Sequence, residues 1–414
     1  MTKRVLFLFL ISFIAPLLAS DDGLIPDRRK EQFLDEPGYL ILPAPYSMPG
    51  LGSGMAYYGG ANNYLGRTDM FAVKTTGDAE GTLLGLWDLH LIDRTAILDV
   101  TYLNFSHTAF NLYAKRGMHS EKDDYSVAES DYYRGLSVKF YLSFFDRRLE
   151  LYTRYHQDES RTVRLLDPDG NVKQEIADPS IEKSHNTDLS ALVDLTDDRQ
   201  DPHHGVRGYL DISHAVPDTE MDPEFYTLTW NVTGYVPINH KSTIALNYQH
   251  SDALMVHEGS KDRNAIATNK GFDCSLGCSQ EALDVIENTY LYNTHGNARS
   301  LGGENAMRSY PGSRFTGAHS RLLGAELRWN FKAERKPIDL YFIRDIRTGV
   351  QVALFHETGT VADNTADIWK DTRSSSGIGV RFIMGSGFVY RFDYATGDEG
   401  QEMTIFVSYP WEDL

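Results

Sequence analysis

The sequence predicts an all-β fold, a transmembrane antiparallel β-barrel of about 16 strands with one loop folded inward. The first observation behind this prediction is the alternation of apolar and polar side chains along many segments. The second is the contrast between short and long links that join those segments. The third is that no stretch beyond the N-terminal run is apolar enough for a spanning helix, so a chain that crosses a bilayer must close into a barrel.

The alternation is clearest in residues 136–144, 149–154, 226–233 and 244–249. In the first of these segments Leu, Val and Phe occupy the even positions, and Ser, Lys and Tyr occupy the odd ones. One side of each ribbon suits lipid and the other suits water, which is the pattern of a membrane barrel. A soluble β-sandwich also alternates, but its strands are typically about 5–6 residues long, shorter than these segments.

The links between segments are of two kinds. Short links such as Asp146-Arg147 and residues 237–240 contrast with long polar links at residues 116–130, 159–185 and 252–287. Membrane barrels have short periplasmic turns and long external loops. Aromatic residues near strand ends also predict the interfacial girdles of such a barrel. They are Tyr132, Tyr133, Phe144, Phe145, Tyr235, Tyr409 and Trp411.

The N-terminus has the features of a secretory signal peptide. A basic start precedes an apolar run, residues 5–19, which ends in small residues. The run is short for a bilayer span, and a short membrane anchor is the alternative. We therefore expect residues 1–20 to be a signal peptide and residues 21–47, which contain four prolines, to be a short irregular periplasmic segment. Residues 48–414 then form the barrel, which an exported bacterial chain would place in the outer membrane.

The charge balance limits the partners. The chain has a formal net charge of −18, and loss of the predicted signal peptide would remove two positive charges, Lys3 and Arg4. The phosphates of a nucleic acid would be repelled by such a chain, so no nucleic acid partner is expected.

The two cysteines, Cys274 and Cys278, lie close together in one long polar link. Exported chains meet an oxidising compartment, so we expect a small loop disulfide. A metal site would need two more ligands nearby, and none has convincing spacing. We therefore expect no metal and no cofactor.

A single arginine between two turns predicts the inward-folded loop. The pair Gly302-Gly303 lets the backbone turn sharply, and Pro311-Gly312 turns it again, so Arg308 lies at the tip of a folded-back loop. A guanidinium in a polar lumen pairs with a carboxylate. Glu357 is the first candidate and Asp393 the second. The residues of this predicted latch are Arg308, Glu357, Tyr310, Gly302, Gly303 and Asp393.

These segments resemble the signature of the bacterial surface antigen family, the BamA/TamA superfamily of outer-membrane β-barrels. In that family a loop carrying Arg-Gly-Phe or Arg-Gly-Tyr folds into the barrel, and its arginine meets an acidic residue on the inner wall. Here Ser309 replaces the usual glycine. The strand motif of the family matches Phe355, Glu357 and Gly359, and its mid-barrel motif matches Asp198, Arg199, Pro202 and Gly205.

A second stretch reproduces the loop motif literally. Residues 206–209 read Val-Arg-Gly-Tyr, but they begin an alternating strand and no glycine pair precedes them. We therefore assign the inward loop to Arg308.

The resemblance implies a barrel that assists the insertion or translocation of proteins at the outer membrane. Its partners would be outer-membrane lipid and unfolded outer-membrane protein clients. Residues 21–47 are far too short for the periplasmic POTRA domains that most members carry, which weakens this role, although a separate periplasmic partner could supply them. A passive channel or a surface-exposed structural barrel is the alternative. No Ser/His pairing has a spacing better than chance, so no enzyme activity is expected, and the latch would act without catalysis.

Overall fold

The structure is a computed structural model, and its described residues cover most of the chain. They are residues 32–33, 37–113, 115–275, 277–333, 338–340, 343–346, 348–384 and 388–411. The predicted signal peptide, residues 1–20, lies outside the described residues.

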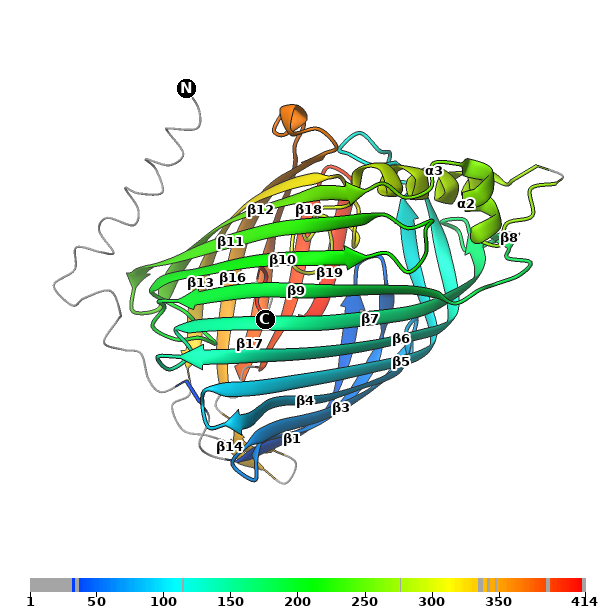
Figure 1. Ribbon diagram of the computed structural model, residues 1–414. Helices are drawn as coiled ribbons and strands as arrows, with labels where there is room; N and C mark the ends of the chain where they lie inside the picture. The colour runs from blue at the N-terminus through cyan, green and yellow to red at the C-terminus, as the bar shows by residue number, and fades with distance from the viewer. Residues whose placement is uncertain are drawn as a thin grey trace.

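The described residues fold into a closed antiparallel β-barrel (Figure 1). Each long strand pairs with the next long strand in the chain, and the first and last strands meet to close the ring. Sixteen strands of eight or more residues build the wall within the described part of the chain, so the predicted fold class is confirmed. They are β1 (Gly38–Met48), β2 (Gly52–Tyr64), β3 (Thr68–Gly77), β4 (Glu80–Ile92), β5 (Ala96–Tyr113), β6 (Tyr125–Phe144), β7 (Leu149–Leu166), β9 (Glu182–Asp194), β10 (Gly205–Val216), β11 (Glu224–Asn239), β12 (Ser242–His257), β13 (His319–Ala333), β16 (Thr348–Ala362), β17 (Arg373–Met384), β18 (Phe388–Gly397) and β19 (Gly400–Val407).

The barrel has two unlike ends. At the short-turn end, tight links such as residues 145–148 join consecutive strands. At the long-loop end the connections are longer, and the one between β12 and β13 runs over residues 258–318. Three short strands lie in connections between wall strands: β8 (Val172–Glu175), β14 (Ile338–Leu340) and β15 (Ile343–Ile346).

Side chains of the wall alternate between the lumen and the outside. On β12, Ala245, Asn247 and Gln249 are buried in the interior, whereas Leu246 and Leu254 are exposed on the outer face. The same period of two holds on the neighbouring strands, so polar side chains gather inside and apolar ones face outward. Inward-facing positions are therefore where a functional site can form.

The first wall strand corrects one expectation. Prolines predicted an irregular segment over residues 21–47, yet Gly38–Met48 forms β1 and pairs along its whole length with β2. A proline fits a strand where its missing N–H faces no continuous partner, and β1 has a continuous ladder on one side only. The expectation is wrong for residues 38–47, and the barrel begins before residue 48.

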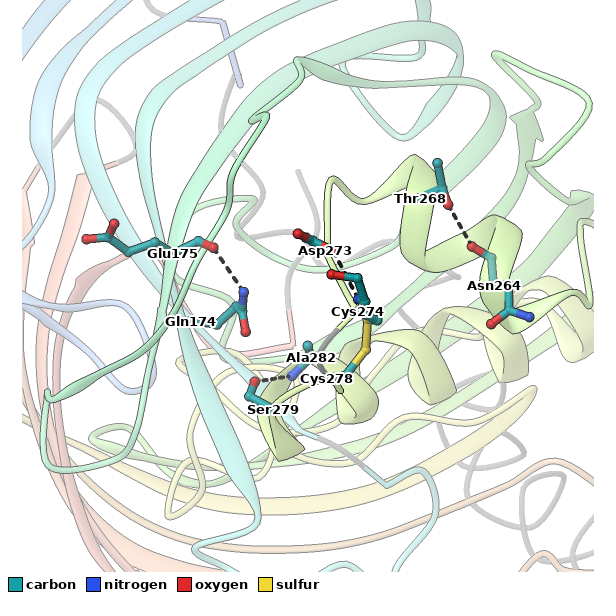
Figure 2. The surroundings of a disulfide bond; sticks show 10 residues. Gln174, Glu175, Asn264, Thr268, Asp273, Cys274, Cys278, Ser279 and Ala282 are labelled. Carbon is teal, nitrogen blue, oxygen red and sulfur yellow. Dashed lines mark hydrogen bonds between the residues drawn. A yellow bond between two sulfur atoms is a disulfide. The ribbon is translucent and has the colours of Figure 1, made fainter.

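Two helices cover part of the long-loop end, where the sequence indicated a polar link (Figure 1). They are α2 (Arg263–Asn269) and α3 (Gln280–His295). Ser279 caps α3 by accepting a hydrogen bond from the backbone N–H of Ala282 at 3.2 Å. Figure 2 shows the disulfide between Cys274 and Cys278 in the link that joins the two helices, as expected.

Both helices pack against the rim of the barrel. Ile266 of α2 and Ile286 of α3 belong to one buried cluster with Ala128 of β6 and Leu165 of β7. This cluster holds the two helices, which we call the cap, against β6 and β7. Among the described residues, neither helix has the length and apolar composition needed to cross a bilayer.

Candidate functional site

After α3 the chain turns back into the barrel and forms the predicted inward loop. Gly302 and Gly303 have φ angles of 114° and 97°, a region that side-chain-bearing residues rarely adopt. A Cβ at Gly302 would clash with the carbonyl oxygen of Pro311. The backbone N–H of Gly303 donates to the carbonyl of Tyr310 at 2.8 Å, so the two ends of the turn meet. The glycine pair is thus required by the local geometry of the loop.

The loop is fixed to the barrel on several sides. Gly312 N–H donates to the carbonyl of Pro49, in the turn after β1, at 2.7 Å. The buried Tyr310 donates its hydroxyl to the carbonyl of Ser374 at 3.0 Å. Ser309, at the position where the resembling family has glycine, donates its backbone N–H to the Ser375 hydroxyl at 2.9 Å. These contacts hold the loop tip against β17.

Arg308 is fully buried and meets three carboxylates. Its backbone N–H donates to Glu357 Oε2 at 3.0 Å, and its Nε donates to Glu357 Oε1 at 3.1 Å. Its Nη1 donates to Asp393 Oδ2 at 2.9 Å and to Glu326 Oε2 at 3.2 Å. The guanidinium carbon lies 3.4 Å from the centre of the Phe355 ring, which adds a cation–π contact. The structure thus brings both predicted carboxylates to Arg308 and adds Glu326.

The pair belongs to a larger buried cluster that the sequence analysis missed. Arg381 Nη1 and Arg328 Nε donate to Glu326 Oε1 at 2.6 and 2.7 Å, and Arg391 Nη1 donates to Asp393 Oδ2 at 3.2 Å. Four arginines and three carboxylates therefore share one water-poor region. The cluster members are Arg308, Arg328, Arg381, Arg391, Glu326, Glu357 and Asp393, each at most 1% exposed.

This burial sets the energetic scale of the latch. An exposed ion pair contributes about 0–1 kcal/mol, whereas removing one partner from a buried pair costs about 3–5 kcal/mol because the other charge is left uncompensated. Since Arg308 and Glu357 both have no exposed surface, the second case applies. Close packing accompanies the pair, because a Cβ at Gly359 would meet Leu301 Cδ1 at 2.5 Å.

The C-terminal tail, residues 408–411, also enters the site. Trp411 Nε1 donates to Glu357 Oε1 at 2.8 Å, its backbone N–H donates to the Asn305 carbonyl at 3.2 Å, and its carbonyl accepts from Asn231 Nδ2 at 2.6 Å. Tyr409 is buried beneath Arg328, whose guanidinium carbon lies 4.2 Å from the ring centre. The expectation that Tyr409 and Trp411 belong to an interfacial girdle is wrong, because the chain turns inward after β19.

The mid-barrel motif lies in the turn between β9 and β10, residues 195–204. Asp198 Oδ1 accepts the backbone N–H of Gln200 at 2.8 Å, which shapes the turn. Arg199 Nη2 donates to Glu150 Oε2 at 2.9 Å, and Pro202 is buried. Gly205 has a φ angle of 113°, and a Cβ there would clash with the carbonyl oxygen of Leu195. These predicted residues are thus together, but at the short-turn end and away from Arg308 itself.

The rejected stretch, residues 206–209, lies within β10. Arg207 of this stretch donates to Asp194 Oδ2 of the adjacent strand at 3.3 Å. It is a residue of the barrel wall, whereas Arg308 is the arginine at the tip of the loop.

Comparison with known proteins gives a family match. The model described as the Omp85 superfamily domain matches residues 63–406. No curated protein matches the sequence.

Solved structures of similar barrels include three chains of low identity. BamA from Haemophilus ducreyi lacking POTRA domains 1–3 is 16% identical with a TM-score of 0.46, and the match covers 90% of this chain and 69% of that one. CdiB from Escherichia coli is 13% identical with a TM-score of 0.46, and CdiB from Acinetobacter baumannii is 12% identical with a TM-score of 0.48. Each CdiB match covers 91% of this chain and 60% of the CdiB chain, so this chain spans less than two thirds of their length.

Proposed function

The chain belongs to the Omp85 superfamily of outer-membrane barrels, and from this premise we propose that it assists the insertion or translocation of other proteins at the outer membrane. Its clients would be unfolded outer-membrane proteins, and outer-membrane lipid would surround the wall. The observation that carries the proposal is the weak seam between β1 and β19.

The seam has few backbone contacts. The pair Ser47 and Ile405 is the registered β1–β19 pair within the described residues, whereas β1 and β2 pair without interruption from Gly38 to Met48. Two side-chain bonds add to it: Ser47 Oγ donates to the Met403 carbonyl at 3.1 Å, and the Tyr390 hydroxyl donates to the Pro45 carbonyl. Neither bond is part of a backbone ladder, so the seam can separate without breaking a run of strand hydrogen bonds.

Two features of the sequence keep the seam short. Pro43 and Pro45 have no N–H, so at these two positions β1 has no donor to offer a neighbouring strand. On the other side β19 has eight residues and the chain then turns inward at Ser408, whose φ angle is 104°. Below this point the edge of β1 pairs instead with β15, at Tyr39 and Leu40. An edge that is only partly paired can accept a strand from another chain.

In this proposal the latch supports the strands that do not open. Arg308 ties the inward loop to β13, β16 and β18 through its three carboxylates. These strands stand on one side of the seam, and on the other side the loop is tied to the turn after β1 by the backbone bond from Gly312 to Pro49. A client would therefore meet a β18–β19 side fixed by buried ion pairs and a less constrained β1. A separate periplasmic partner would deliver the client at the short-turn end.

The test is reconstitution of the purified barrel into lipid vesicles, with two measurements on the same preparation. The first is the rate at which an unfolded barrel client inserts, and the second is ion conductance. We expect assisted insertion. Steady conductance without any gain in insertion would instead support the alternative of a passive channel.

A cross-linked seam sharpens the test. Cysteines at Ser47 and Ile405, which face each other across the seam, should form a disulfide that lowers the insertion rate severalfold until it is reduced. The matched control places cysteines at Ser376 and Thr396, which face each other on β17 and β18. Oxidation of the control should leave insertion unchanged. If seam and control pairs behave alike, the seam is not the site of action.

A further inference from the structure

The turn between β9 and β10 contacts both ends of the described chain. At the N-terminal side, the backbone N–H of Arg199 donates to Gln32 Oε1 at 2.8 Å. At the C-terminal side, Asp201 Oδ1 accepts the Tyr409 hydroxyl at 2.7 Å. Asp198 Oδ1 accepts the backbone N–H groups of both Gln200 and Asp201, so the two binding positions belong to one hydrogen-bonded turn. Two segments that are distant in sequence, residues 32–33 ahead of β1 and residues 408–411 after β19, thus share a single small element.

The N-terminal end is firmly anchored at this place. The backbone N–H of Gln32 donates to both carboxylate oxygens of Asp146, at 3.0 and 3.2 Å. Phe33 is 6% exposed, and the guanidinium carbon of Arg147 lies 4.4 Å from its ring centre. The ring packs in a buried cluster at the short-turn end, which also contains Ile97, Tyr141, Tyr152 and Leu192.

Ion pairs connect this anchor to the turn. Arg147 Nη1 donates to Glu150 Oε1 at 3.4 Å, and Glu150 Oε2 accepts from Arg199 Nη2 at 2.9 Å. The backbone N–H of Arg199 also binds Gln32. Arg199 is therefore connected to residues 32–33 in two ways, through its backbone and through the ion pairs of its side chain. Loss of Phe33 from its pocket would therefore disturb Arg147 and, through Glu150, Arg199.

The C-terminal side leads from the turn to the latch. Asp201 fixes Tyr409, and two residues later Trp411 donates to Glu357. Glu357 is the carboxylate that binds Arg308 through both its backbone and its side chain. A Cβ at Gly324 would clash with the Trp411 ring, so the tail fits the wall closely and has little room to shift without leaving its site.

We infer that the β9–β10 turn couples the N-terminal segment to the latch, so that displacement of Gln32 and Phe33 loosens Arg308. Phe33, Asp201 and Tyr409 are positioning residues in this arrangement, since they act on Arg308 through the turn and the tail. The inference rests on the proposed function only for the role of the latch. It adds that the position of Gln32 and Phe33 controls the latch. A periplasmic partner that displaces Gln32 and Phe33 would release the latch from the short-turn end.

Hydrogen–deuterium exchange of the purified full chain in detergent tests the coupling. In Phe33→Ala, we expect exchange to rise about tenfold in peptides that cover residues 303–311 and 408–411, because their local opening becomes easier. Phe272→Ala is the matched control, since Phe272 is 7% exposed and lies in the buried cluster of the cap. It should raise exchange in the cap only. A Phe33→Ala effect confined to residues 32–33 and 145–150 would overturn the inference.

A second variant tests the route. Tyr409→Phe keeps the ring and removes the hydroxyl that Asp201 accepts. In the double variant with Tyr409→Phe, adding Phe33→Ala should increase the exchange of residues 303–311 little beyond that of Tyr409→Phe alone. If the two residues acted independently, their effects would add. Additive effects would overturn the route through the turn. Phe33→Tyr, which retains the ring, should restore latch protection, and a latch that stays loose in this variant also contradicts the inference.

Two safeguards keep the test decisive. If Phe33→Ala does not fold, Gln32→Ala removes the side-chain oxygen that accepts from the Arg199 backbone and should raise latch exchange to a smaller extent. The readout also needs no client. Coupled exchange without assisted insertion would therefore remove the proposed function and leave the coupling, and the reverse result would remove the coupling alone.

Discussion

The two walls that flank the seam are held together by different means. The arginine wall, which we define as β13, β16, β17 and β18, carries the buried cluster that Arg308 completes. The glycine wall, defined as β1 to β4, has aromatic rings over glycines on its inner face. A Cβ at Gly60 would clash with Tyr58, and a Cβ at Gly85 would clash with Phe71. One wall is thus fixed by side-chain charge pairs and the other by its backbone ladders and ring packing.

The difference shows where a barrel of this kind can yield. In the arginine wall, strands, inward loop and C-terminal tail share the same carboxylates, so none of them can move alone. In the glycine wall a charge pair such as Lys74 with Glu80 has side chains 51% and 55% exposed and spans 3.8 Å. We therefore expect the glycine wall to be the side that moves when the seam opens, while the arginine wall stays in place.

The largest expected effect is that of Arg308→Ala, because Arg308 is the cation that pairs with the fully buried Glu357. We expect a loss of about 3–5 kcal/mol in the free energy of unfolding, measured by urea titration in detergent. Lys74→Ala in the glycine wall is the control and should cost about 0–1 kcal/mol, since its pair is exposed. Arg308→Lys keeps the charge but loses the forked geometry, and should fall between the two. Equal losses of unfolding free energy in Arg308→Ala and Lys74→Ala would show that the two walls are not stabilised differently.

A matched pair of glycine substitutions comes next. Gly324→Ala in the arginine wall would force a methyl group into the Trp411 ring, and such overpacking costs about 1–3 kcal/mol. Gly59 in the glycine wall has no atom within 4 Å of an added Cβ, so Gly59→Ala should be close to neutral. Urea midpoints of the two variants provide the measurement. A neutral Gly324→Ala would show that the tail is not packed against β13.

The barrel and the loop were predictable because each depends on local sequence. Alternation with a period of two follows directly from a wall with lipid on one face and water on the other. Gly302 and Gly303 marked the turn because few other residues adopt its backbone angles, and the loop then carried Arg308 inward. Strand β1 was missed because prolines normally disfavour strands, and only the ring shows that one edge of β1 needs few donors.

The rest of the site depends on register, which no single strand reveals. Glu326, Arg381 and Arg391 look like ordinary lumen-facing charges in their own strands, and only the neighbouring strands show that they converge. Charges at alternate positions, as in Arg391 and Asp393, were the available signal. The tail was missed for another reason. Its aromatic pattern continues that of β19, and the inward turn depends on a positive φ angle at Ser408, a non-glycine residue.

A smaller effect is expected from Trp411→Phe. The ring is largely retained, but Glu357 loses the indole N–H that donates at 2.8 Å. Because Arg308 still binds Glu357, we expect a loss of about 1 kcal/mol, with faster exchange of residues 303–311. Trp369 at the long-loop end is 40% exposed, and Trp369→Phe is the control, with no expected change. If Trp411→Phe were as stable as Trp369→Phe, the tail would not contribute to the stability of the latch.

The smallest effect concerns pH and the turn that holds the tail. The pKa of Asp201 lies below its ordinary value of 3.8: burial alone would raise it, but the hydrogen bonds from His203 and Tyr409 and the charge of Arg328 outweigh burial. A lowered folded-state pKa means that the stabilisation by Asp201 is present above 3.8 and is lost as the pH falls through the lower folded-state value.

The difference in unfolding free energy between the wild type and Asp201→Asn isolates this contribution. It should be present at about pH 5 and shrink in more acidic solution. The difference in unfolding free energy between the wild type and Lys74→Ala should contain no contribution from the titration of Asp201, because Lys74 lies on the glycine wall. A difference that already shrinks near neutral pH would mean that Asp201 is not held in its charged form by the turn. The link between residues 32–33 and the C-terminal tail would then have to depend on the packing of Tyr409 beneath Arg328.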